Sequence, residues 1–70
     1  MPSTQHHREL DIAPGQHFRA RDGIVWEVSE IIRTYDELPH VALVKPQDRL
    51  TRKVISVDAL FDKRLFSVVE

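Results

Sequence analysis

The densest group of residues that could do chemistry is basic and lies between residues 45 and 53. Four basic residues stand there against a single acidic one: Lys45, Arg49, Arg52 and Lys53. Such a cluster can neutralise several phosphates and bind nucleic acid in a salt-dependent way. Arg19 and Arg21 would extend the site if they lie on the same side of the domain. The plainer interpretation is a solvated hairpin tip whose charges protect a sheet edge.

The overall charge does not favour nucleic acid as the main ligand. Ten basic and eleven acidic residues give a formal charge of −1, whereas nucleic-acid-binding domains are usually basic. No exposed aromatic residue clearly accompanies the basic cluster to stack on bases. We therefore keep RNA or DNA binding through this loop as the alternative function.

Four histidines raise the question of a metal site. His6 and His7 are adjacent, while His17 and His40 stand alone. A zinc site needs three or four converging ligands, and this spacing does not supply them. We expect no metal and no cofactor, and we expect His17 to pair with Glu27 across two strands instead.

The sequence offers little for catalysis. It has no cysteine nucleophile, no Gly-x-Ser-x-Gly elbow, no phosphate-binding glycine loop and no His-Glu-x-x-His pair. Its nearest carboxylate pairs are Asp36 with Glu37 and Asp58 with Asp62, which fall in predicted turns. A 70-residue domain also has little room for a shielded pocket. We predict a non-enzyme without a small-molecule substrate.

The elements that must position these residues begin with a hairpin over residues 16–28. A two-residue Asp22-Gly23 loop would put two arginines beside the apolar set of the second strand. A three-residue loop, 21–23, avoids this and places Phe18 opposite Trp26, with Gly23 in a left-handed conformation. We predict the three-residue loop.

Five strands and one helical turn follow from alternation, turn signals and β-branched residues. The helical turn covers 58–63 with Asp58 as its cap, and a bulge or bend is expected at 31–32, where alternation breaks. The predicted strands span residues 16–20, 24–33, 40–44, 52–57 and 65–69.

This plan resembles an SH3-like small barrel, Tudor-like in the order of its features. The resemblance covers residues 15–69 and depends on Pro14-Gly15, on the segment 22–28 and on the segment 57–60. It implies a closed five-stranded β-barrel and an aromatic cage for methylated lysine or arginine. We assign the large aromatic residues to packing instead.

The predicted domain is a single all-β unit over residues 14–70, preceded by a flexible, partly disordered tail over residues 1–13. At this size the core must come from about a dozen apolar side chains or from a second copy of the chain. The predicted core consists of Phe18, Ala20, Ile24, Trp26, Val28, Val41, Leu43, Ile55, Val57, Leu60, Phe66 and Val68.

Apolar residues left on the outer face suggest a contact surface. Exposed apolar patches mark association sites, unless Leu10 and Ile12 of the tail cover them. We predict a non-catalytic protein-interaction module that binds a protein partner or a second copy of itself. No apolar run is long enough to span a membrane, so we expect a cytoplasmic protein. The predicted contact residues are Leu65, Val69, Val25, Val44 and Tyr35.

Overall fold

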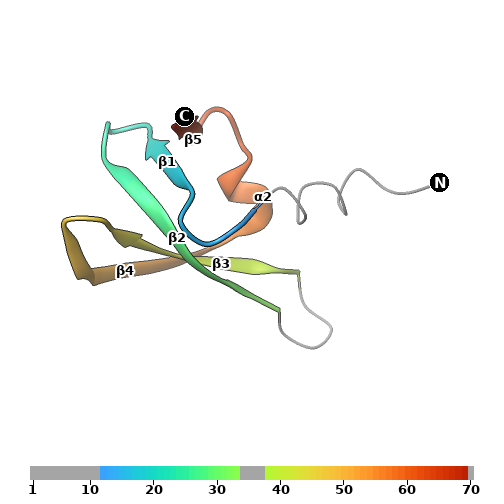
Figure 1. Cartoon of the computed structure of the whole chain (residues 1–70). Coiled ribbons are helices and arrows are strands. Elements are labelled where there is room, and N and C mark those ends of the chain that lie inside the picture. Colours follow the sequence, from blue (N-terminus) through green and yellow to red (C-terminus); the bar gives the residue numbers. More distant parts are fainter. Residues whose placement is uncertain (1–11, 34–37, 70) are drawn as a thin grey trace.

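The computed structural model describes residues 12–33 and 38–69, which form a single antiparallel β-sheet with one helical turn (Figure 1). The helical turn, α2 (Val57–Leu60), precedes the last strand, so the predicted all-β fold with one helical turn is confirmed. The five strands are β1 (His17–Ala20), β2 (Val25–Ile32), β3 (His40–Lys45), β4 (Asp48–Ser56) and β5 (Phe66–Val69).

The strand order in the sheet is β4-β3-β2-β1-β5. The strand β2 joins the two halves, because its first residues pair with β1 and its later residues pair with β3 (Figure 1). The strands β4 and β5 form the two edges and do not pair with each other. The sheet is therefore open, and the predicted closure into a barrel is not confirmed.

The hairpin between β1 and β2 has the predicted register. His17 lies opposite Glu27, and Phe18 lies opposite Trp26. The Gly23 N–H donates to the Ala20 carbonyl at 2.8 Å, and Gly23 has a φ of 92°, a conformation that glycine adopts without strain. The three-residue loop is confirmed, and with it the face to which each side chain points.

Three local predictions were wrong by a few residues. The strand β4 begins at Asp48, so the predicted loop shrinks to a turn at residues 46–47. The register shift in β2 falls between Val28 and Glu30 rather than at 31–32. The cap of α2 is Ser56, whose Oγ accepts the Ala59 N–H at 3.1 Å, because α2 begins one residue before Asp58.

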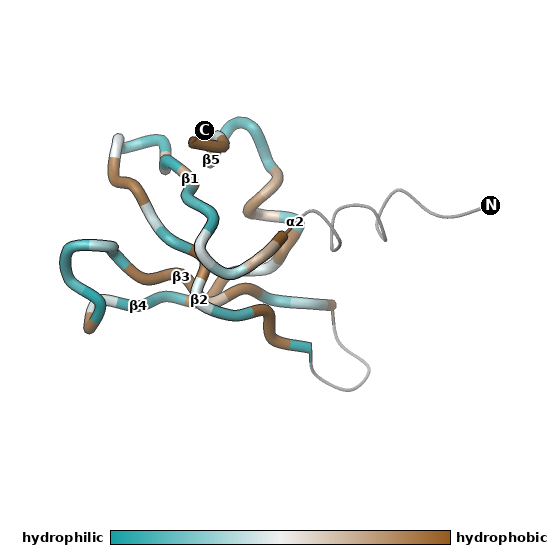
Figure 2. Tube along the Cα trace, viewed as in Figure 1, coloured by the Kyte–Doolittle hydropathy of each residue, from teal (hydrophilic) through white to brown (hydrophobic). Residues whose placement is uncertain are grey.

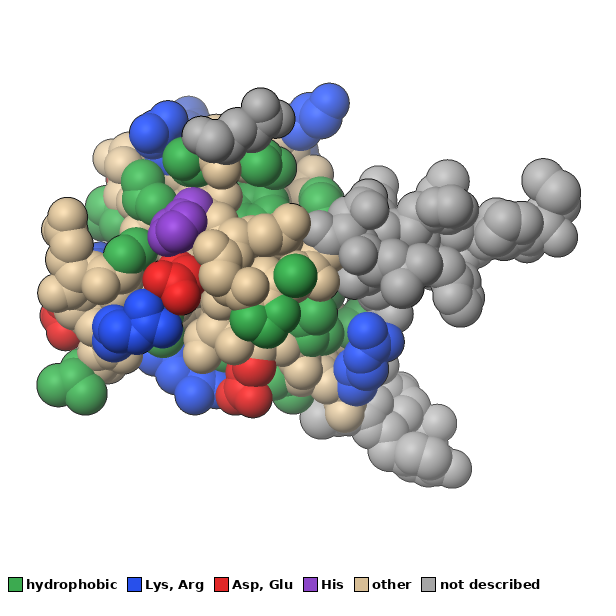
Figure 3. Space-filling view, in the orientation of Figure 1, with side chains coloured by type: hydrophobic (Ala, Val, Ile, Leu, Met, Phe, Trp, Pro, Cys, Tyr) green, Lys and Arg blue, Asp and Glu red, His purple; other side chains and the backbone are tan. Residues whose placement is uncertain are grey.

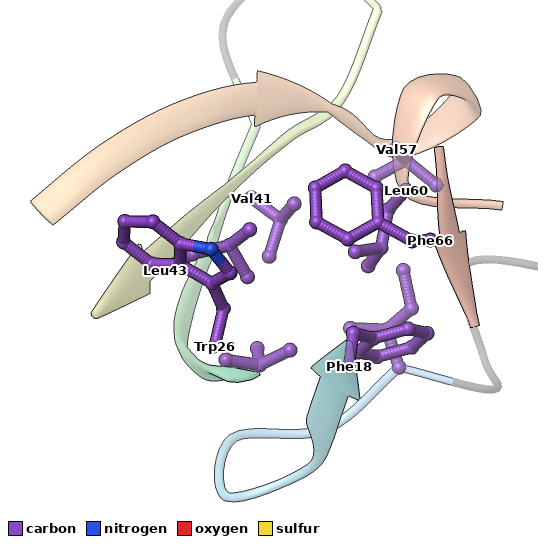
Figure 4. Packing of buried hydrophobic residues seen from close by; sticks show 9 residues of the cluster. Phe18, Trp26, Val41, Leu43, Val57, Leu60 and Phe66 are labelled. Atoms are coloured by element: carbon purple, nitrogen blue, oxygen red, sulfur yellow. The ribbon is translucent and has the colours of Figure 1, made fainter. Parts of the chain in front are cut away.

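The core lies on the inner face of the sheet, where aromatic rings from β1, β2 and β5 converge on aliphatic side chains of β3 and α2 (Figure 4). Ile12 also belongs to this core, although it precedes the predicted domain boundary. Ala20 and Ile55 are partly buried against the cluster. The buried members are Ile12, Phe18, Trp26, Val28, Val41, Leu43, Val57, Leu60 and Phe66.

Two predicted core residues are exposed. Ile24 is 37% exposed because it lies at the turn end of the hairpin, outside β2. Val68 is 56% exposed, although it faces the inner side opposite Phe18. It belongs to an edge strand, so only one side of it is flanked by another strand. Burial therefore depends on position within the sheet as well as on alternation.

Candidate interaction surface

Both arginines of the predicted phosphate-binding loop are held by glutamates of β2. Arg49 donates through its two Nη atoms to the Glu27 carboxylate at 3.0 and 3.2 Å, and Arg52 donates to Glu30 at 3.0 Å. Because β3 lies between β2 and β4, both ion pairs cross the outer face of β3. They explain why Val44, predicted to be an exposed contact residue, is only 5% exposed.

The Glu27 carboxylate is electrostatically satisfied. The hydrogen bond from Arg49 is the main cause that lowers the pKa of Glu27, and the charge of Arg49 and the nearby His17 act in the same direction. The same contact raises the pKa of Arg49. The predicted pair of His17 with Glu27 is confirmed, with 3.7 Å between Nε2 and Oε1. A phosphate that approached Arg49 would have to displace a carboxylate.

The two lysines of the same loop lie on the opposite face of the sheet. Lys53 Nζ is 4.3 Å from the centroid of the Trp26 ring and 5.3 Å from that of Phe66, while Lys45 Nζ is 5.8 Å from the Trp26 ring. These distances are those of cation–π contacts. The predicted basic loop is thus divided between two faces. Lys53 lines one hollow of about 500 Å³ together with Arg21, whereas Arg49 and Arg52 are held by glutamates.

Arg19 and Arg21 also share a shallow hollow with the residues that precede β5. This basic hollow, of about 280 Å³, is lined by the two arginines together with Lys63, Arg64 and Ser67. Arg64 pairs with Asp62 at 3.0 Å, and this contact lowers the pKa of Asp62. Within residues 12–33 and 38–69, the other three cations form no ion pair. In Figure 3, Lys and Arg side chains are visible at the top of the molecule, where Figure 1 shows β5 and the segment that precedes it.

The strand β5 leaves backbone groups at the open edge of the sheet. The Arg21 N–H donates to the Leu65 carbonyl at 2.9 Å, which sets the hydrogen-bonding alternation between β1 and β5. By this alternation the peptide groups of Phe66 and Val68 face away from β1. The Phe66 N–H donates to the Asp62 carbonyl. The Val68 N–H and the carbonyls of Phe66 and Val68 therefore point toward the open side.

An apolar hollow of about 260 Å³ lies along the inner face of β5. Side chains from β1, α2 and β5 line it, including Phe61, Phe66 and Val68. Lys63, Phe66 and Ser67 line both this apolar hollow and the basic hollow. The edge strand therefore adjoins two neighbouring hollows, one mainly apolar and the other mainly basic.

The predicted contact residues have unequal exposure. Leu65, just before β5, is 42% exposed, whereas Val69 and Val25 are half-buried. Tyr35 lies outside the described residues, as do Leu10, His6 and His7, and the pair at 36–37. Val25 and Val69 line a further shallow depression together with His17 and Lys45.

Sequence reasoning missed Lys63, Arg64 and Phe61 as parts of this surface. The sequence did hold an indication of the basic part of this surface, because Lys63 and Arg64 stand directly before the last predicted strand. The two basic residues meet Arg19 and Arg21 only because β5 pairs with β1, a contact between segments more than forty residues apart.

A metal-binding cluster and a membrane-spanning helix are both absent from the described part of the chain. Its histidines, aspartates and glutamates nowhere gather in a group of three or more that could hold a metal ion. None of its helices is long and apolar enough to cross a membrane.

Comparison of the chain with protein-family models, curated proteins and solved structures found no match.

Proposed function

We propose that this chain is a non-catalytic protein-interaction module that receives a partner strand at the open edge of β5. Strand addition uses main-chain hydrogen bonds for affinity and alternate side chains for specificity. The observation that carries the proposal is the unpaired edge of β5 between two hollows.

The two edges of the sheet differ in how they resist pairing. Natural sheets protect their edges with charged side chains. The strand β4 has four charged residues within its first six, whereas β5, Phe-Ser-Val-Val, has none. In Figure 2 the β5 segment is coloured as hydrophobic, while the segment before it is hydrophilic. The composition of β5 is therefore that of an edge suited to pairing.

We also propose that the architecture is of the SH3-like type. Support comes from the meander of β1 to β4, from the return of β5 to β1, and from the single helical turn before β5. Lys53 strengthens this view, because its side chain reaches from β4 to the Phe66 ring of β5. A side chain, rather than hydrogen bonds between strands, brings the two edges together.

Nucleic-acid binding through residues 45–53 is the weaker proposal. Arg49 and Arg52 would have to exchange their glutamate partners for phosphate, and Lys53 would have to leave the Trp26 ring. Each exchange reduces the gain from a new phosphate contact. The unpaired edge of β5 requires no such exchange.

Proline substitution at the edge tests the interaction proposal. Proline removes a backbone N–H, and edge strands tolerate it where that N–H faces solvent. Val68→Pro should block strand addition at β5. Val54→Pro is the matched control, because Val54 lies on the opposite edge, is similarly exposed at 48%, and has an outward N–H by the alternation of β3 with β4.

The ligands for this test come from a displayed library of random peptides selected on the wild-type chain and then titrated by NMR. We expect shifts over residues 66–69 that disappear in Val68→Pro and persist in Val54→Pro, with both variants folded by circular dichroism. Sedimentation velocity measures self-association in the same variants. The proposal fails if no peptide and no second copy binds, or if binding is insensitive to the proline at position 68.

A further inference from the structure

We infer that the partner strand alternates apolar and acidic side chains, with its apolar side chains in the hollow beside Val68 and its acidic ones over Arg19 and Arg21. This inference rests on the proposed function, since it specifies the partner of the same edge. The register of β5 carries it, because Val68 lies opposite Phe18 on the inner side while Ser67 lies opposite Arg19 on the outer side, and each of the two adjoins a hollow.

The inner face of β5 accepts apolar side chains. A residue paired directly opposite Val68 would share its face, because opposed residues in a ladder point to the same side. Val68 is 56% exposed there, and Phe61 and Phe66 line the hollow beside it. An apolar side chain at this position would cover surface that the chain itself leaves exposed to water.

The outer face of β5 presents unpaired positive charge. Ser67 lies opposite Arg19 on this face, and its short side chain leaves space above the strand. Neighbouring strands are only about 4.8 Å apart, so the long side chain of Arg19 can extend over Ser67 toward an added strand. Lys63 approaches the same hollow from the chain before β5. Carboxylates at this place would meet two or three cations without acidic partners in the described residues.

The two faces specify a period of two. Successive side chains of an extended strand point to opposite faces, so a strand on β5 alternates between the apolar and the basic hollow. A ligand with the same composition but without alternation cannot satisfy both faces at once. A short edge strand forms few backbone hydrogen bonds, so these side-chain contacts decide which sequences bind.

Three synthetic hexapeptides with blocked termini test the inference: Val-Glu-Val-Glu-Val-Glu, Val-Lys-Val-Lys-Val-Lys and Val-Val-Val-Glu-Glu-Glu. We expect the first to bind the wild-type chain best in NMR titrations, with weaker binding as salt screens the charges. Arg19→Gln with Arg21→Gln should weaken it about fivefold to tenfold, as expected for the loss of two exposed charge contacts. The matched control, Arg49→Gln with Arg52→Gln, removes the same charge and should leave affinity within twofold.

The possible outcomes separate the inference from the proposed function. If the acidic and basic alternating peptides bind equally and Val68→Pro abolishes the binding of both, strand addition at β5 remains supported. The preference for an acidic partner is then refuted. If the block peptide binds as well as the alternating one, the period-two argument is refuted. If a short oligothymidylate binds the Arg19 and Arg21 face while no peptide does, the site takes phosphate and the inference is overturned. If no peptide binding, including that of library-selected peptides, responds to Val68→Pro, both proposals fall.

Discussion

Replacing Lys53 with alanine should loosen the contact between the two edges of the sheet. The Lys53 ammonium lies over the rings of Trp26 and Phe66, at 4.3 and 5.3 Å from their centroids. Its aliphatic stem comes from β4, whereas Phe66 belongs to β5, and these strands share no ladder. Lys53 therefore links two parts of the sheet that backbone hydrogen bonds leave separate.

The expected loss is about 1–2 kcal/mol of unfolding free energy. A partly exposed cation–π contact contributes about 0.5–1 kcal/mol, and the shorter distance makes the Trp26 contact the stronger of the two. Truncation also removes the apolar stem that carries the ammonium to the rings, and burial of such a stem adds to stability. For a domain of this size, each kcal/mol lowers Tm by about 4–8 °C. Lys53→Met keeps most of the stem and should recover part of this loss.

Urea unfolding monitored by the fluorescence of Trp26, the single tryptophan, measures the effect. Trp26 is 7% exposed, and Lys53→Ala should make its fluorescence easier to quench with acrylamide. Lys63→Ala is the matched control, because Lys63 is exposed and is not one of the cations over an aromatic ring. Unchanged stability and quenching in Lys53→Ala would refute the linking role of this lysine.

Three further predictions follow from the core, the turn and the outer face. Trp26→Ala should cost about 3–5 kcal/mol and unfold the domain in thermal denaturation, whereas a stable variant would show that the indole is not central. Gly23→Ala should cost about 1–2 kcal/mol because of the φ of 92°, although nothing lies within 4 Å of the added Cβ; equal stability in urea would contradict the turn geometry. The lowered pKa of Glu27 means that its stabilising contribution is present above the pKa of about 4.3 for an unfolded glutamate and is lost as pH falls through the lower folded value. Glu27→Gln should therefore flatten the loss of stability below about pH 4.3 in acid titrations, and an unchanged acid profile would argue against the Arg49 contact.

Local patterns in the sequence predicted the hairpin well. The conflict between the arginines and the apolar residues around the Asp22-Gly23 turn indicated a three-residue loop, and the observed register agrees. One face of the second strand is apolar, and a shift of one residue would expose it. Five strands and a helical turn could likewise be predicted because each is a short-range pattern, although β4 extends further than its residues suggested.

The interaction surface could be predicted only in part. Leu65 was expected to be exposed and is, but Val44 is covered by ion pairs that cross from β2 to β4. Those pairs join residues 22 positions apart, and no local pattern indicates them. The exposure of Val68 likewise follows from the edge position of β5, which is a property of strand order.

The sequence by itself determined which side chains alternate together, because the period of a strand is fixed by backbone geometry. It therefore specified the inward faces of β1 and β2 and the place of the tight turn. Only the tertiary structure decided which cations are neutralised, which cover Trp26, and which remain unpaired beside β5. These outcomes depend on distances between residues on non-adjacent strands, and such distances exist only after the sheet has formed.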